Sequence, residues 1–259
     1  MEEKEGTKEI KWVVDHDARF GYYDERSSMQ TESKVSTATA LEMAEAGVLF
    51  GHMKSETHPR TKPYIAAMRN EVELFDPQAT LDSIEKAKEF LEKTIEDGKM
   101  VLFVGTLVPA KERIMQIAQS YGMPYVVSRW IGGTLTNFAA ITDRVRRYQE
   151  LKEKNEKGEL KKYTKKEQLD FRKEIGKLSK IFGGLTTLTR MPDVVFIVDI
   201  TEHEIAVREA RQKNIPVVAF VDTDADPNLV DYPVFASDHS TRSIAWVLDK
   251  LFATIKKTK

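Results

Sequence analysis

The chain has 259 residues, with 40 lysines and arginines against 41 aspartates and glutamates, and it has no cysteine. This length suggests one or two domains with a sizeable buried core, and apolar residues at 41% argue against global disorder. The lack of cysteine excludes a disulfide scaffold, a thiolate zinc site, an iron–sulfur protein and a cysteine nucleophile, and it fits a reducing compartment. No apolar run approaches the roughly 20 residues of a membrane span, and the N-terminus lacks the apolar stretch of a signal peptide.

Charge is distributed unevenly along the chain. Residues 1–40 and 41–143 each carry a net charge of −3, and residues 181–259 carry −2. Residues 144–180 contain 14 basic and 7 acidic side chains, a net charge of +7, inside a chain whose total is −1. This segregation suggests an element that faces a polyanion. A solvated surface element is the alternative, because lysine is common on exposed helices.

The first 36 residues show no sustained periodicity. They predict a mobile extension, or one that orders on a partner, with a short docking piece around Trp12, Phe20 and Tyr22.

From residue 37 onward, apolar periodicity and turn residues predict strands that alternate with helices. The first predicted elements are a helix from Thr37 or Thr39 to Gly47, strands at 63–65 and 72–75 around a turn at 69–70, and a helix at 80–97. A strand at 100–104, a helix from Pro109, a strand at 125–127 and helices at 138–158 and 164–182 follow. The last elements are a strand at 194–198, a helix at 202–213, a strand at 215–221, a loop at 222–233 and a helix at 240–255.

The helices within 138–182 have narrow apolar stripes. Residues on the stripes are spaced by three and four, and they are Phe138, Ile141, Val145, Tyr148 and Leu151, then Leu169, Ile175, Leu178 and Phe182. Thr164 with Glu167 forms a capping box at the start of the second helix. Glycines follow each helix, at 158 and at 183–184. Two such helices are expected to pack against each other as an αα-hairpin.

The predicted fold class is α/β, a doubly wound, mostly parallel sheet sandwiched by helices, with an inserted antiparallel α-hairpin that is coiled-coil-like. The expected organisation is an N-terminal extension at 1–36, an α/β sandwich domain at 37–133 and 183–259, and the hairpin insertion at 134–182.

Three motifs suggest chemistry only weakly. Gly105-Thr106 joins a strand to a helix as in nucleotide-binding folds, but it lacks the other glycines and the lysine of those motifs. The acidic run at 222–226 could hold Mg²⁺, although aspartate also favours such turns because it bonds local backbone. His52 and His58 lack a third nearby ligand. The sequence therefore predicts no catalytic, cofactor-binding or metal-binding residues and no cofactor; a nucleotide- or Mg-dependent α/β enzyme is the alternative.

The segment 129–137 is more informative. Arg129 and Trp130 precede the pair Gly132-Gly133 at the start of a helix. Exposed amides and a positive helix end can accept a phosphate there. Alternatively, the tryptophan packs under the root of the hairpin and the glycines allow close backbone approach.

Several blocks together resemble one family, the second family of bacterial small-subunit ribosomal proteins, or S-two family. They are Glu45-Ala46-Gly47-Val48-Leu49-Phe50-Gly51-His52, Pro59, Lys62-Pro63-Tyr64-Ile65, Leu102-Phe103-Val104-Gly105-Thr106, Arg129-Trp130-Ile131-Gly132-Gly133-Thr134-Leu135-Thr136-Asn137, Pro192-Asp193-Val194-Val195-Phe196-Ile197-Val198-Asp199, Glu209-Ala210-Arg211, Asn214-Ile215-Pro216-Val217, Val221-Asp222-Thr223-Asp224, Asp226-Pro227 and Asp231-Tyr232-Pro233. The blocks stand in order and at family spacing over residues 41–255.

The resemblance implies a structural, non-catalytic protein of the small ribosomal subunit. It implies an α/β sandwich with a protruding α-hairpin, binding to small-subunit rRNA and to other ribosomal proteins, and help in recruiting the large mRNA-binding protein. The expected location is cytoplasmic and ribosome-associated, with neither membrane nor DNA as a partner. A paralogue that docks on proteins without binding rRNA remains an alternative.

The sequence departs from the family pattern at several positions. Leu49 stands in place of histidine, Ser55-Glu56 and Leu107-Val108 replace basic pairs, Ser128 replaces histidine, Thr189-Arg190 replaces a glycine pair and His203 replaces an acid. These changes suggest a divergent lineage with fewer basic contacts.

The expected RNA contacts are basic side chains of the hairpin and of two loops, with one aromatic side chain that could stack on a base. They are Lys54, Arg60, Lys62, Arg129, Trp130, Arg144, Arg146, Arg147, Lys161, Lys162, Lys165 and Lys166.

Overall fold

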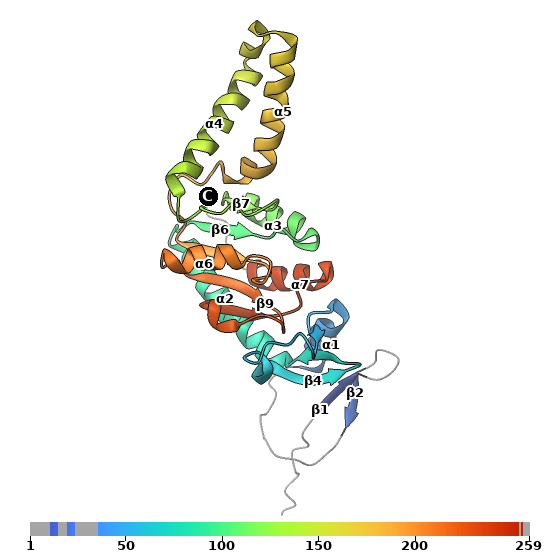
Figure 1. The fold of residues 1–259 in the computed structure, drawn as a ribbon. Coiled ribbons are helices and arrows are strands. Elements are labelled where there is room, and N and C mark those ends of the chain that lie inside the picture. Colours follow the sequence, from blue (N-terminus) through green and yellow to red (C-terminus); the bar gives the residue numbers. More distant parts are fainter. Residues whose placement is uncertain (1–10, 15–19, 24–35, 254, 256–259) are drawn as a thin grey trace, which may run out of the picture.

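The computed structural model describes residues 11–14, 20–23, 36–253 and 255. Its centre is a parallel sheet of five strands in the order β10-β9-β8-β6-β7 (Figure 1). The strands are β6 (Val101–Val104), β7 (Tyr125–Val126), β8 (Val194–Ile197), β9 (Val217–Val221) and β10 (Tyr232–Phe235). Every residue of β6, β8 and β9 is buried, as expected for strands covered on both faces. The predicted α/β class is confirmed.

Helices flank this sheet. They are α2 (Pro77–Glu96), α3 (Val108–Ser120), α6 (Glu204–Gln212) and α7 (Thr241–Phe252). The chain leaves β6 toward β7 through α3 and leaves β8 toward β9 through α6, so the two crossovers run in opposite directions along the sheet. Since such crossovers are right-handed, α3 and α6 cover opposite faces. The crevice where the direction reverses lies between β6 and β8.

A second, smaller sheet is antiparallel and has the order β3-β5-β4. Its strands are β3 (Phe50–Met53), β4 (Ile65–Arg69) and β5 (Val72–Phe75), and the helix α1 (Thr37–Ala46) precedes it. Asn70 and Glu71 have φ values of 48° and 65°, which a two-residue hairpin turn of this twist requires. The predicted bounds of the strand at 63–65 are wrong, because Lys62–Tyr64 forms a 3-10 turn, η1, and the strand begins at Ile65.

Other boundaries also differ from the predictions. The side chain of Ser36, rather than Thr37 or Thr39, caps α1 by accepting from the Thr39 amide. The helix expected from residue 80 starts at Pro77, because the side chain of Asp76 caps it and proline suits a first helical turn. Strand β10 lies at the end of the predicted loop 222–233. It is short, contains a proline and forms the sheet edge, so it carries little periodic signal.

Residues 138–182 contain α4 (Phe138–Glu156), the 3-10 turn η2 (Glu159–Lys162) and α5 (Lys165–Phe182), which we call the arm. The two helices contact each other and project from the sheet (Figure 1). The apolar stripe of α4 is buried from Ile141 to Leu151. On α5, Leu169 is 50% exposed, so its predicted place on the stripe is wrong; Phe171, two residues later, is half-buried and contacts the ring of Tyr163.

Two further strands lie near the N-terminus. β1 (Lys11–Val14) pairs antiparallel with β2 (Phe20–Tyr23), and the register places Trp12 opposite Tyr22. The rest of the predicted extension, residues 1–10, 15–19 and 24–35, lies outside the described residues. No helix within the described part is long and apolar enough to cross a membrane.

Candidate nucleic-acid interface

The arm carries half of the expected RNA contacts on its solvent side. The exposed ones are Arg144, Arg146, Arg147, Lys162, Lys165 and Lys166. The backbone of Lys161 belongs to η2, and its side chain is outside the described part of the chain.

Ion pairs divide these cations into two groups. Arg146 lies 3.2 Å from a carboxylate oxygen of Asp143, and Arg147 lies 3.8 Å from one of Glu174. The remaining exposed cations form no ion pair with any described residue, and they are Arg144, Lys162, Lys165 and Lys166. A cation without a carboxylate partner is the better one for a phosphate, because no existing pair has to break.

Lys165 and Lys166 are held at the start of α5 by local chemistry. The hydroxyl of Thr164 accepts from the amide of Glu167 at 3.4 Å, and the Glu167 carboxylate accepts from the Thr164 amide at 2.9 Å. These hydrogen bonds from Thr164 lower the pKa of Glu167 below its usual range. The predicted capping box is confirmed, and it fixes the first turn of α5 on which both lysines stand.

Residues 127–137 join β7 to α4, and we call them the root loop. Its amides surround the carboxylate of Glu209, which comes from α6 and is buried. The carboxylate accepts from the amides of Gly133, Leu135 and Thr136 at 2.7, 2.9 and 3.1 Å. It also accepts from the Thr136 hydroxyl at 3.1 Å and from the Trp130 indole at 3.2 Å.

The predicted phosphate site at the glycine pair is therefore already filled by an internal anion. Burial raises the pKa of Glu209, but the donors from Leu135, Gly133, Thr136 and Trp130 outweigh it, so the pKa lies below its ordinary value. The charged carboxylate meets the donors that a phosphate would need. Local sequence could not show this, because Glu209 stands more than 70 residues after the loop.

The two remaining loop candidates differ in exposure. Arg129 is exposed. Trp130 is half-buried, packs against the hydrophobic core and donates its indole N–H to Glu209. Of the two alternatives for this tryptophan, the structure favours packing at the root of the arm.

Lys54, Arg60 and Lys62 form a second group, in the segment between β3 and β4. All three are exposed. The Arg60 guanidinium lies 2.6 Å from the Asp226 carboxylate, so this arginine already has a partner. Figure 1 places β4 at the opposite end of the molecule from α4 and α5. The expected contacts therefore form two separate surfaces rather than one.

The crevice between β6 and β8, where nucleotides bind in related architectures, is closed by His203. The ring is 2% exposed. Its Nδ1 lies 2.7 Å from the Asp199 carbonyl, which can only accept, so Nε2 accepts from the Thr106 hydroxyl at 3.0 Å and from the Thr106 amide at 3.3 Å. A Cβ at Gly105 would lie 3.0 Å from the side chain of Ile114, so this glycine serves close packing of α3.

The acidic run after β9 mostly bonds nearby backbone. Asp222 accepts from the Thr223 amide at 2.6 Å, and Asp226 accepts from the Asn228 amide at 3.0 Å. This agrees with the structural interpretation of these aspartates.

Asp222 also belongs to a cluster that local sequence did not reveal. The ligand atoms of His52, Asp222, Asp238 and His239 all lie within 4.8 Å of one another. The two Nε2 atoms of the histidines are 2.7 Å apart, although 187 positions separate the residues. Burial raises the pKa of Asp222 to about 7 and that of Asp238 to about 9. Two imidazoles and two carboxylates form a donor set that suits zinc; His58, considered earlier with His52, is not a member.

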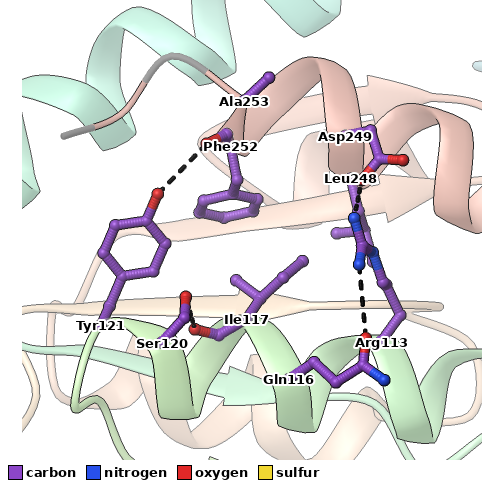
Figure 2. A pocket seen from close by; sticks show the side chains of 9 residues that line it. All are labelled: Arg113, Gln116, Ile117, Ser120, Tyr121, Leu248, Asp249, Phe252 and Ala253. Atoms are coloured by element: carbon purple, nitrogen blue, oxygen red, sulfur yellow. Dashed lines mark hydrogen bonds and ion pairs between the residues drawn. The ribbon is translucent and has the colours of Figure 1, made fainter. Parts of the chain in front are cut away.

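A surface crevice between α3 and α7 is lined by Arg113, Gln116, Ile117, Ser120, Tyr121, Leu248, Asp249, Phe252 and Ala253 (Figure 2). Its polar groups pair with one another. Arg113 forms an ion pair with Asp249, the Tyr121 hydroxyl donates to the Phe252 carbonyl at 3.2 Å, and the Ser120 hydroxyl donates to the Ile117 carbonyl at 2.8 Å. None of these groups is arranged as a nucleophile beside a base.

Comparison with known proteins covers most of the chain. A family model described as ribosomal protein S2 matches residues 43–258. The chain belongs to the ribosomal protein S2 family. A protein of Coprothermobacter proteolyticus named small ribosomal subunit protein uS2 is 42% identical over 217 residues, which cover 84% of this chain and 81% of that protein. The proteins of the same name from Thermus thermophilus and Fusobacterium nucleatum are 42% and 43% identical, over 82% and 81% of this chain and 83% and 85% of theirs.

Members of the S2 family are structural constituents of the small ribosomal subunit and not enzymes. The predicted family, the predicted role as a structural constituent of the small subunit and the non-catalytic role are confirmed. Membership of the S2 family does not support the alternative of a nucleotide- or Mg-dependent enzyme. The hydrogen bonds of Thr106 with His203 and of Asp222 with the Thr223 amide agree with a structural role for these residues.

Proposed function

We propose that this S2-family protein binds small-subunit rRNA mainly through the arm, and that the root loop and the segment around Lys62 make secondary contacts. The observation that carries the proposal is the set of exposed cations on α4, η2 and α5 that have no carboxylate partner among the described residues. They lie in the segment of net charge +7, while the rest of the chain is acidic. Cations of this kind gain affinity for RNA by releasing its condensed counterions.

In this proposal, residues 134–182 are a hairpin inserted into an α/β domain made of residues 37–133 and 183–259, and residues 1–36 are an extension. The buried stripe of α4 and the half-buried Ile175 and Leu178 of α5 support a coiled-coil-like seam. A seam of this type stiffens a long element. A stiff element can read RNA by its shape and backbone, as proteins do on A-form helices.

The proposed role for the acidic remainder is to face solvent or basic neighbouring proteins. The family resemblance implies that one neighbour is the large mRNA-binding protein of the small subunit. It also implies a cytoplasmic location on the ribosome.

Sucrose-gradient fractionation tests the proposal. Wild-type chain should sediment with small subunits, and a variant with Arg144, Lys165 and Lys166 replaced by glutamine should shift toward the free fractions. Raising salt should release the wild type steeply if rRNA drives association. Wild type found only in free fractions would reject the proposal, and salt-insensitive association would favour docking on proteins alone.

A further inference from the structure

The arm is joined to the sheet by two short connections. It begins two residues after Thr136 in the root loop and ends at Phe182, where the 3-10 turn η3 (Gly183–Leu185) packs against β7. A Cβ at Gly184 would lie 2.3 Å from the Tyr125 carbonyl, so the second connection is held by close backbone contact. In the first connection Leu135 is buried in the core, whereas Gly132 has open space around its Cβ position.

Helix α4 also lacks a cap of its own. Asn137, at its N-cap position, makes no side-chain hydrogen bond to the helix start. The hydrogen-bond donors just before the helix instead bond the carboxylate of Glu209. It accepts five hydrogen bonds, and they come from Trp130, Gly133, Leu135 and Thr136. One carboxylate thus fixes the loop on which the first arm helix stands.

The carboxylate is itself held firmly by the domain. Glu209 belongs to α6, whose Ala206, Val207 and Ala210 are buried in the core. The charged hydrogen bonds it accepts are stronger than neutral ones. Any displacement of the root loop relative to α6 would leave the buried Leu135 amide and the part-buried amides of Gly133 and Thr136 without this acceptor, which is costly.

We propose that Glu209 is a positioning residue for RNA binding: its contact with the root loop sets the direction in which the arm presents its basic side chains. This inference rests on the proposed function. It predicts that Glu209 itself does not touch RNA, and that its loss redirects the arm while every cation of the arm remains present.

Glu209→Gln tests the inference, because it keeps the shape but replaces one acceptor oxygen by a donor. Glu204→Gln is the matched control, since Glu204 lies on the same helix, is exposed and, among the described residues, pairs only with Arg208. The chain has no cysteine, so cysteines introduced at the exposed positions Glu89 and Glu159 give the only two spin-label sites. Their distance distribution, measured by pulsed electron resonance, reports the arm direction in the full chain.

We expect Glu209→Gln to broaden or shift this distribution and to lower the affinity for an in vitro transcript of small-subunit rRNA about tenfold, because separated contacts no longer engage together. Glu204→Gln should change neither quantity. A wild-type distribution in Glu209→Gln, whatever its melting temperature, overturns the inference. If that variant does not fold, Glu209→Asp, which keeps the charge but reaches less far, is judged by the same criterion. A wild-type chain that does not bind the transcript would instead reject the proposed function.

Discussion

Lys165 and Lys166 occupy an electrostatically poor place for cations. They are the first two residues of α5, where the helix dipole is positive and the amides point outward. Each cation there costs about 0.3–1 kcal/mol at low ionic strength. Neither lysine forms an ion pair within the described part of the chain that would offset this cost. Replacing both lysines with glutamine should therefore stabilise the folded chain slightly and raise the melting temperature by about 1–4 °C.

The same double variant should bind RNA more weakly. If each lysine contacts one phosphate, the slope of log affinity against log salt falls by about 0.9 per lysine. At about 0.1 M salt, losing both contacts lowers the affinity by up to about 60-fold. Filter binding or fluorescence anisotropy with an rRNA transcript, repeated over a salt series, measures the slope and the affinity together. Thermal melting of the same samples gives the stability.

A matched control exists at the C-terminal end of α4. Lys152 lies 4.0 Å from the Glu156 carboxylate, and Lys157 lies 2.5 Å from that of Glu153. The double change Lys152→Gln with Lys157→Gln alters the net charge equally but removes cations that already have partners. It should leave the salt slope nearly unchanged. Wild-type affinity and slope after loss of Lys165 and Lys166, or an affinity loss accompanied by a lower melting temperature, would refute the reasoning.

Three further predictions concern stability and metal binding. Gly184→Ala should destabilise the chain by about 3 kcal/mol or more, since its Cβ would lie 2.3 Å from the Tyr125 carbonyl and overpacking at backbone has no easy relief; urea unfolding measures it. Burial raises the pKa of Asp238 from 3.8 to about 9, so the folded chain holds more protons than the unfolded chain between these values. In the presence of a chelator, the free energy of unfolding should therefore fall as pH rises from about 4 to about 9. The fall should be smaller in the Asp238→Asn variant than in the wild type. Zn²⁺ at about 100 times its dissociation constant should add about 2.7 kcal/mol to the free energy of unfolding, and His239→Ala should abolish this gain; calorimetry with and without Zn²⁺ measures both.

Each of these three predictions has a result that contradicts it. For Gly184→Ala, the contradicting result is an unfolding midpoint equal to that of Gly176→Ala, since nothing lies near a Cβ at Gly176. For Asp238, it is a stability profile that rises with pH over the same range. For the cluster, it is an unchanged response to Zn²⁺ when His239 is removed, with His58→Ala as the histidine control outside the cluster.

Local features were predictable from the sequence because they depend on neighbouring residues. The capping box of Thr164 with Glu167 needs only three positions of sequence, and the continuous apolar run at 101–104 needs only burial on both faces. The parallel α/β sheet followed from the alternation of such runs with helices. Strand β10 was not predicted, because the sequence of a short edge strand that contains Pro233 resembles that of a loop.

The site was less predictable because its chemistry depends on residues far apart in the chain. The glycine pair of the root loop suggested a phosphate site, and nothing nearby indicates that Glu209 fills it. His52 has no metal partner close by in the sequence, because Asp222 follows β9, and Asp238 and His239 lie in the loop after β10. The exposed cations of the arm were identifiable from charge alone. Their ion pairs, which separate Arg146 from Arg144, required the structure.

The closed crevice between β6 and β8 has a consequence for how the fold is maintained. In many α/β proteins this crevice receives a nucleotide, whose binding adds to stability in proportion to its concentration. Here the imidazole of His203 lies in the crevice, where it bonds Thr106 after β6 and the carbonyl of Asp199 after β8. We therefore expect the shape of this protein to be independent of metabolite levels.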